Sequence, residues 1–212
     1  NEPLEQERIY NESVLIRLLP SYELLLNRGI SEETIRTFKI GMGQSGKLKW
    51  RLVGPVYNRR GQIHGFFGRW FKEQTPNEKT PKYLLIGRKT NFIWPCHLNH
   101  NILIEKRKLI LLESPTDSLT LWTCGTKNFN CMFGISLSGT LLNYIISINP
   151  TEIILALNRD EHNVGQEATQ KIKSKLLKFF DESVIRIVTP PLKDISETYQ
   201  KLGKEKVIEL YG

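Results

Sequence analysis

The sequence predicts an α/β protein in which a parallel-sheet domain of βα repeats follows a smaller, basic α+β subdomain. Strand-like and helix-like segments alternate from Ile102 onward, which is typical of a parallel sheet covered by helices on both faces. The first hundred residues instead combine helical periodicity with a hairpin pattern. They also carry 16 Lys and Arg against nine Glu and no Asp, whereas residues 151–212 have no net charge. We therefore expect two parts, residues 1–100 and 101–212.

The composition is that of a globular protein. Of its 212 residues, 40% are apolar and 25% charged, enough to bury one large core or two small ones. No apolar run approaches the ~20 residues that span a bilayer, and residues 1–8 lack a secretory signal. We expect a cytoplasmic protein with no membrane partner. Because the chain starts at Asn1 rather than Met, we also expect a piece of a longer protein.

The basic charge is concentrated in one stretch. Residues 1–100 account for +7 of the net charge of +8, and residues 36–89 hold 13 basic and two acidic residues among several aromatic ones. Such a stretch favours a polyanion as partner, and the alternative is a merely solvated basic face. The three cysteines, which we expect to be buried thiols, are too few and too widely spaced for a disulfide framework or a zinc site; they are Cys96, Cys124 and Cys131.

Helical patterns open the chain. Periodic apolar residues over 14–26 end at the C-cap signal of Arg28 and Gly29. Ser31 then caps a second short helix, because its hydroxyl can accept from the first free backbone amides.

A hairpin follows these helices. Residues 51–57 and 62–70 have strand patterns, and residues 58–61 supply the turn. Trp50 and Trp70 lie on apolar strand faces, so we expect both in the core.

The second part repeats one unit. The predicted strands are residues 108–113, 128–133, 152–157 and 183–188. A helix is expected after each, beginning with Ser114 as N-cap and Pro115 as the first helical residue, and later over residues 164–180 and after Asp194. In such sheets ligands bind beyond the carboxyl ends of the strands.

Carboxylates collect at those strand ends. Glu113 ends the first strand, and Asp117, Asp160 and Asp194 follow strands, whereas Asp181 caps the end of a helix. Clustered carboxylates repel one another unless a cation neutralises them, and oxygen ligands without His or Cys favour Mg²⁺ or Mn²⁺. For any single acid, the alternative is a helix cap or a solvated loop.

Three segments resemble the motifs of the Toprim superfamily. Residues 111–117 resemble its first motif, in which a strand ends in Glu and an acid follows four residues later. Residues 155–160, followed by Gly165, resemble its Asp-x-Asp motif, and Lys193-Asp194 resembles the acidic turn that closes the site.

Their order and spacing are closest to the DnaG-type primase subgroup. Upstream, residues 25–41, 55–69 and 81–84 resemble the opening, the hairpin and the linking segment of the primase catalytic core. The resemblance spans about residues 20–203. It implies a DNA primase core that copies single-stranded DNA into short RNA primers from ribonucleoside triphosphates, and a bacterial or bacteriophage origin.

The resemblance also assigns roles to individual residues. Glu113 would lie nearest the chemistry, Asp160 and Asp194 would hold metal, and Asn158 would add an amide oxygen. Asp117 would be a ligand, would orient a basic residue, or would simply be a carboxylate of the first helical turn. One to three Mg²⁺ or Mn²⁺ ions and no zinc are implied for this part of the protein.

Basic residues of the first part would bind nucleotide and DNA. Arg69 and Lys82 would line the cleft between the two parts, with Tyr83 either stacking on a base or lying half-buried. Lys49 and Arg51 would contact the template backbone. A zinc-binding module and a replicative helicase are expected in flanking regions.

Two departures leave the activity open. Asn158 stands where the family has an acid, and Ser196 stands where a second acid often follows Asp194. Because an amide brings no negative charge, metal affinity should fall. The alternatives are therefore a catalytically weak or inactive single-stranded-DNA-binding remnant and a Toprim nuclease.

Overall fold

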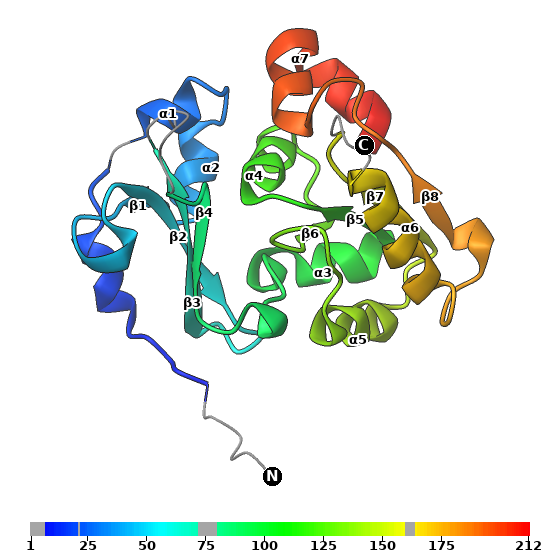
Figure 1. Ribbon diagram of the computed structural model, residues 1–212, viewed down its shortest axis with the longest axis horizontal. Coiled ribbons are helices and arrows are strands. Elements are labelled where there is room, and N and C mark those ends of the chain that lie inside the picture. The colour runs from blue at the N-terminus through cyan, green and yellow to red at the C-terminus, as the bar shows by residue number, and fades with distance from the viewer. Residues whose placement is uncertain (1–6, 21, 72–79, 160–163) are drawn as a thin grey trace.

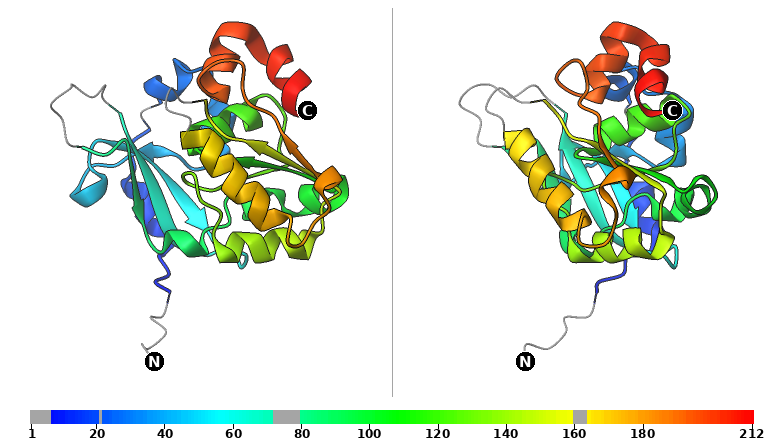
Figure 2. Two further views of the ribbon diagram at one scale, coloured as in Figure 1. Left: turned by 45° about the vertical axis from the view of Figure 1, so that its right-hand side comes forward. Right: turned by 90° about the vertical axis from the view of Figure 1, so that its right-hand side faces the viewer.

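The computed structural model describes residues 7–20, 22–71, 80–159 and 164–212 (Figure 1). Its strands form two four-stranded sheets, each in its own half of the molecule. The basic N-terminal half and the C-terminal half lie side by side, with helix α4 facing the first half (Figures 1 and 2). The predicted α/β class, with a parallel sheet preceded by an α+β part, is confirmed.

The N-terminal sheet is antiparallel, with the order β1-β2-β3-β4. Its strands are Gly41–Met42 (β1), Arg51–Tyr57 (β2), Ile63–Trp70 (β3) and Tyr83–Ile86 (β4). The predicted hairpin is thus confirmed as β2 and β3. Its register places Arg51 opposite Trp70, and Arg69 in turn lies opposite Tyr83 of β4.

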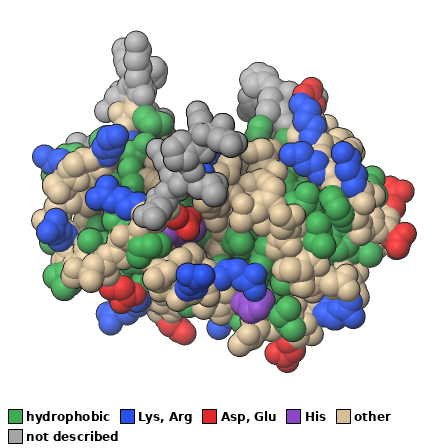
Figure 3. All heavy atoms as spheres, turned by 90° about the horizontal axis from the view of Figure 1, so that it is seen from below, with side chains coloured by type: hydrophobic (Ala, Val, Ile, Leu, Met, Phe, Trp, Pro, Cys, Tyr) green, Lys and Arg blue, Asp and Glu red, His purple; other side chains and the backbone are tan. Residues whose placement is uncertain are grey.

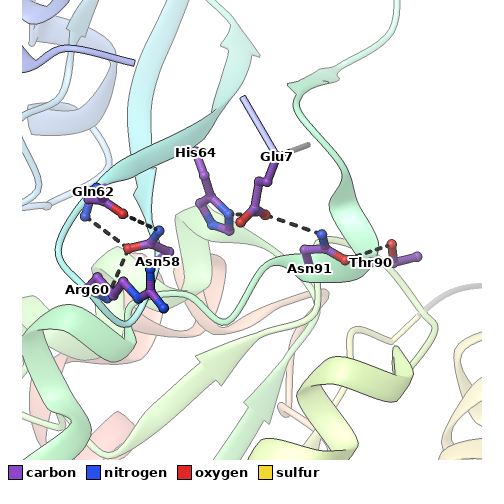
Figure 4. Close-up of polar contacts among 7 residues, drawn as sticks. All are labelled: Glu7, Asn58, Arg60, Gln62, His64, Thr90 and Asn91. Carbon is purple, nitrogen blue, oxygen red and sulfur yellow. Dashed lines mark hydrogen bonds and ion pairs between the residues drawn. The ribbon is translucent and has the colours of Figure 1, made fainter. Parts of the chain in front are cut away.

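The hairpin turn is closed by the side chain of Asn58 (Figure 4). Its Oδ1 accepts from the backbone amides of Arg60 at 2.9 Å and Gln62 at 3.0 Å. Gly61 adopts a φ of +74°, which a residue without Cβ tolerates readily. Local turn chemistry therefore fixes the register of β2 and β3.

The segment before this sheet is fastened to the start of β3 and to the segment after β4. The Glu7 carboxylate lies 2.6 Å from Nδ1 of His64 and accepts from Nδ2 of Asn91 at 3.2 Å (Figure 4). The Tyr10 amide donates to the Ile63 carbonyl at 2.8 Å. The N-terminal segment therefore enters the fold at β3.

The N-terminal helices are shorter than the periodicity predicted. They are the 3₁₀ helix Glu12–Arg17 (η1) and the α-helices Glu23–Leu26 (α1) and Glu32–Thr37 (α2). The expected continuous helical pattern over residues 14–26 is wrong in its middle, because Leu19 pairs with Met42 as a β-bridge. Ser31 caps α2 as predicted, accepting from the Thr34 amide at 3.2 Å.

The C-terminal sheet is parallel, with the order β6-β5-β7-β8. Its strands are Lys108–Leu112 (β5), Phe129–Cys131 (β6), Glu152–Ala156 (β7) and Ile185–Ile187 (β8). Its helices are Cys96–Lys106 (α3), Pro115–Thr123 (α4), Gly139–Ile148 (α5), Val164–Leu176 (α6) and Ile195–Tyr211 (α7). Three single-turn 3₁₀ helices complete the described elements: Gly46–Leu48 (η2), Lys89–Asn91 (η3) and Glu182–Val184 (η4).

Alternate residues of β5 face opposite layers of helices. Leu109 and Leu111 lie in a core with residues of α3, α5 and α6, whereas Ile110 and Leu112 pack with α4 and α7. All four side chains are fully buried. Burial on both faces explains why these strands have continuous apolar runs rather than alternating ones.

The two halves share a third core. It joins Leu25, Ile35 and Phe67 of the N-terminal half to Leu119 of α4 and Cys131 of β6. Helix α3 spans residues 96–106 and so crosses the division that we expected at residue 100. The division into residues 1–100 and 101–212 stays a prediction.

Several further expectations can be compared with the structure. The three cysteines are buried and unbridged, as predicted. Within the described residues, no helix is both long and apolar enough to cross a membrane. Trp50 is different from expectation: it is 49% exposed and lies outside the core, because its φ of +60° turns the chain just before β2 begins. Trp70 is partly buried.

A candidate metal and phosphate site

The sheet has a point at which its chain order reverses, between β5 and β7. The chain runs from β5 to β6 on one side and then crosses to β7 on the other. Leu112 is paired with Ala156, so Glu113 and Asn158 both lie just beyond the carboxyl ends of these adjacent strands. Such a crevice is where parallel α/β sheets bind ligands.

Asp117 lies in the first turn of α4, beside this crevice, and is 1% exposed. Its Oδ2 accepts from the Ser114 hydroxyl at 2.6 Å, and its Oδ1 accepts from the Ser196 amide at 3.0 Å. Burial raises the pKa of Asp117 to about 7, and the charges of Asp194 and Glu113 add to this, against the two hydrogen bonds. The structure places Asp117 in the first turn of α4 with these two hydrogen bonds, and its roles as a metal ligand or as the group that orients a basic residue stay predictions.

Asp194 is brought to the same place by the loop before α7. Its Oδ1 caps α7 by accepting from the Glu197 amide at 2.7 Å. The Arg159 amide donates to the Lys193 carbonyl at 2.9 Å, which ties the segment after β7 to this loop. The structure therefore gathers Glu113, Asp117 and Asp194 around the crevice, as the strand order predicts.

Asn158, two residues beyond the end of β7, has a buried side-chain oxygen without a partner among the described residues. This atom is Oδ1, and the Ser196 hydroxyl is likewise buried without a partner in that part of the chain. A carbonyl-type oxygen in this state suits a hard cation. Asp160 lies outside the described residues. Among the described residues, no three His, Cys, Asp or Glu side chains group closely enough to hold a metal.

Cations of the N-terminal half face these acids. Arg69 on β3 is 8% exposed, and its Nε and Nη1 have no partner in the described part of the chain. Burial lowers the pKa of Arg69, and the nearby charge of Arg28 lowers it further. Nε of Arg28 is likewise buried and unpaired in that part. Two neighbouring guanidinium groups with unused donors form a site for an anion with several oxygens.

Lys82 belongs to the same group of charges. Its pKa is lowered by burial first and then by Arg69, although the residue retains an exposed surface; Asp194 and Asp117 act in the opposite direction. The acids of the C-terminal half and the cations of the N-terminal half therefore interact electrostatically across the boundary between the two halves. On the side away from α7, Figure 3 shows Lys and Arg scattered among hydrophobic and uncharged groups instead.

Two expected ligand-binding residues are used in other ways. Arg51 is 3% exposed, and its Nη1 donates to the carbonyls of Gly68 at 3.1 Å and Pro81 at 2.9 Å. The expectation that Arg51 contacts DNA is therefore wrong, since its guanidinium joins β2, β3 and the segment before β4. The Tyr83 hydroxyl lies 2.6 Å from Oγ1 of Thr116, which favours the half-buried reading over stacking. Lys49 is exposed, as a template contact requires.

Sequence reasoning missed two cations of this site. The sequence patterns mark Arg28 only as part of a helix C-cap. They mark Lys193, whose charge acts on Lys82, only as a neighbour of Asp194. No local pattern marks Arg28 as a ligand-binding residue: it lies beside Gly29, which allows α7 to approach because a Cβ there would clash with the Tyr199 ring. That contact is visible only in three dimensions.

The fold and motifs match known proteins. Residues 110–199 match the family described as Toprim-like. The DNA primase of Helicobacter pylori (strain J99) is 24% identical over 207 residues, covering 82% of this chain and 35% of the relative. The DNA primase of Enterococcus faecalis is 23% identical over 228 residues, covering 88% and 36%. The chain thus spans about a third of the length of the curated relatives it matches.

Solved structures agree. A DnaG primase catalytic domain bound to single-stranded DNA has a TM-score of 0.76 at 19% identity, over 93% of this chain and 75% of that one. The E. coli primase catalytic core has a TM-score of 0.72 at 19% identity, over 94% and 72%. The Aquifex aeolicus primase, with zinc-binding and RNA polymerase domains, has a TM-score of 0.73 at 21% identity, over 89% and 54%.

These matches define the class of fold. Residues 110–199, in the C-terminal half, are similar to Toprim-like domains and contain most of the parallel sheet. The chain as a whole has the fold of a DnaG-type primase catalytic core, and the resemblance seen in its motifs is confirmed.

Proposed function

We propose that this chain is the RNA-synthesising part of a DNA primase, an enzyme that joins ribonucleotides on a single-stranded DNA template and releases pyrophosphate. One observation carries the proposal: acids at the switch point of the Toprim-like sheet face two guanidinium groups from the other half, each of which has a buried donor without a partner among the described residues. Acids suit divalent cations and guanidinium groups suit phosphates, and a nucleotidyl transfer needs both.

Glu113, Asp194 and Asn158 would hold Mg²⁺ or Mn²⁺, together with Asp160. Their oxygens fit a hard cation, and the unused Oδ1 of Asn158 supports this assignment. One to three bound ions would lower the pKa of the attacking hydroxyl and stabilise the leaving oxygen. Glu113 is our candidate for the acid nearest the reacting atoms.

Asp117 has a positioning role in this proposal. Because it is buried and hydrogen-bonded to Ser114 and to Ser196, it joins the turn after β5 to the start of α7. It thereby keeps Glu113 and Asp194 at a fixed separation. Its pKa is raised by burial first and then by the charges of Asp194 and Glu113.

Arg28, Arg69 and Lys82 would bind the triphosphate or the template backbone. Two guanidinium groups with free donors can take a phosphate in a bidentate manner, and Lys82 adds a point charge. A single-stranded DNA template is supported by the similar catalytic domain that is bound to such DNA. The zinc-binding module, the helicase and a cytoplasmic location stay predictions.

A second candidate is a binding module with little or no catalysis. The observation that favours it is Asn158, which leaves the switch point with one carboxylate fewer than the family pattern. This candidate predicts DNA binding that survives loss of the acids, whereas the enzyme requires them. A nuclease would instead cut DNA with Mg²⁺ and ignore ribonucleotides.

The test is extension of a short RNA annealed to single-stranded DNA, with labelled ATP and GTP, in Mg²⁺ and in Mn²⁺. Supplying the RNA removes any need for an initiation module. We expect extension that is abolished in Glu113→Gln and Asp160→Asn while both variants still bind the template. Template binding without extension in any of the three proteins would favour the binding module, and DNA cleavage would favour the nuclease.

A further inference from the structure

Trp50 is an exposed aromatic residue held in an unusual backbone conformation. Its side chain is 49% exposed and its φ is +60°, a value that bulky residues rarely adopt. The conformation is imposed by pairing on both sides, since its amide donates to the Gly43 carbonyl at 3.0 Å and its carbonyl accepts from Phe71 at 3.4 Å. The fold therefore keeps the indole at the surface.

The loop that carries Trp50 is fixed rather than loose. The Lys49 amide donates to the Gly46 carbonyl at 3.2 Å, and Leu48 packs against the core of β2 and β3. Gly43 allows the loop to close over it, because a Cβ there would lie 2.2 Å from the Leu48 carbonyl oxygen. A rigid aromatic surface binds a flat ligand without the entropic cost of ordering it.

The surroundings of the indole are cationic and aromatic. Nζ of Lys49 lies 5.2 Å from the ring centroid of Trp50, and the Phe71 ring lies 6.3 Å away at 32° to it. Lys47 and Lys49 are both exposed. Aromatic rings beside lysines are the pattern that binds single strands, with bases stacking and phosphates paired.

This loop lies at the same sheet end as the phosphate-binding cations. Trp50 precedes β2, Phe71 follows β3, and Lys82 precedes β4, three neighbouring strands (Figure 1). The Trp70 amide donates to the Lys82 carbonyl at 2.9 Å, which aligns these ends. The backbones of Trp50 and Lys82 are two inter-strand spacings apart, which is about 10 Å across the sheet. One bound strand of nucleic acid can reach both.

We infer that Trp50 is a stacking platform for a base of the single-stranded DNA template, with Lys49 on the adjoining phosphate. The inference rests on the proposed function and adds to it a residue of this chain outside the site of acids and guanidinium groups. The expected partner is nucleic acid rather than a protein, because the charged residues near the indole, Lys47 and Lys49, are cationic and exposed. The stretch of residues 36–89, with 13 basic and two acidic residues, has the matching charge.

The experiment measures the affinity of the protein for a labelled oligo-dT strand at several salt concentrations. We expect Trp50→Ala and Trp50→Leu to weaken binding by about 5-fold or more, and Trp50→Phe to retain most of it. The slope of affinity against salt should stay unchanged in these variants, whereas Lys49→Ala should reduce it by about one. Phe179→Ala is the matched control, because Phe179 is 55% exposed in the other half and should have no effect.

A second readout is tryptophan fluorescence. The chain has four tryptophans, and stacking of a base on Trp50 should quench the emission of that residue. Addition of oligo-dT should therefore quench a smaller part of the total emission in Trp50→Leu than in wild type. Equal affinities of wild type and Trp50→Ala would overturn the inference. Equal affinities of Trp50→Leu and Trp50→Phe would also overturn the inference. They would show that position 50 needs only an apolar side chain, as a contact with a protein partner would, and not an aromatic ring on which a base can stack.

Failure of the inference and failure of the proposed function are separable. If wild type extends RNA and Trp50→Ala binds template equally well, the platform is wrong and the primase stands. If wild type binds DNA through Trp50 but extends nothing, the platform stands and the enzyme is wrong. Absence of any single-strand binding by wild type would overturn both.

Discussion

The backbone amide of Ser196 donates to Oδ1 of Asp117 across 3.0 Å and joins the first turns of helices α7 and α4. The two residues are 79 positions apart in the sequence, and both are 1% exposed. The same carboxylate accepts from Ser114 at 2.6 Å. Asp117 thus holds together the two loops that carry Glu113 and Asp194, and this makes its ionisation a property of the whole site.

Replacement of Asp117 by Asn should stabilise the metal-free protein at alkaline pH. The pKa of Asp117 is raised from 3.8 to about 7, so between these values the folded state binds more protons than the unfolded state. The contribution of Asp117 to stability is therefore fully present below about pH 4 and is lost as pH rises through 7. The amide oxygen can still accept from the Ser196 amide, and the NH2 group can donate to the Ser114 hydroxyl oxygen in place of accepting from it. Asp117→Asn should therefore gain on the order of 2 kcal/mol at pH 8.

Urea denaturation with a chelator present, at pH 4 and pH 8, measures this gain. Wild type should lose stability between the two, and Asp117→Asn should lose less. Asp181→Asn serves as a control at the far end of the domain. Identical pH profiles for wild type and Asp117→Asn would show that the carboxylate keeps its ordinary pKa.

Conversion of Asn158 to Asp should tighten metal binding. The Oδ1 atom of Asn158 is buried and unpaired in the described part of the chain, so an acid there would add charge to an oxygen already positioned. We expect about 10-fold higher affinity for Mn²⁺ by calorimetry, and lower stability in chelator because a further carboxylate approaches Asp117 and Asp194. Asn158→Ala should weaken the binding, and unchanged affinity in both variants would place the metal elsewhere.

Arg69 and Arg28 should be needed for phosphate binding and dispensable for folding. Nε of Arg28 and both Nε and Nη1 of Arg69 are buried without a partner among the described residues, although Arg69 also has a side-chain hydrogen bond with Tyr83. Arg69→Met and Arg28→Met should each weaken nucleoside triphosphate binding by roughly 10- to 100-fold, with little change in melting temperature. Arg36→Met, which loses only an exposed pair with Glu32, should bind as wild type. A fall in melting temperature with unchanged binding would make these arginines structural.

Tyr83→Phe should loosen the contact between the halves. The hydroxyl of Tyr83 is 2.6 Å from that of Thr116, which is buried in α4. Loss of the hydrogen bond should cost about 1 kcal/mol of unfolding free energy, with less additional loss when Thr116→Val is already present. A double-mutant cycle by urea denaturation measures this coupling. Fully additive effects would mean that the hydroxyls do not interact.

The local signals in the sequence were reliable where one residue acts on its own backbone. The caps at Ser31 and Ser114 and the turn at Asn58 are present as predicted, because each side chain bonds to amides a few residues away. Helical periodicity failed over residues 14–26 because Leu19 found a partner in Met42, on a strand that forms later in the chain. Such competition between local and distant pairing is not visible in a local pattern.

The sequence by itself determined the order of elements, the parallel sheet and the convergence of Glu113, Asp117 and Asp194. These follow from periodicity and from the rule that parallel strands end at one edge. Only the tertiary structure decided which cations are available: Arg51 is consumed by backbone carbonyls, Arg69 and Arg28 retain unused donors, and Trp50 is exposed rather than buried. The physical reason is that burial and hydrogen-bond partners depend on distant residues. A charged side chain becomes a binding group only where the fold leaves it unpaired.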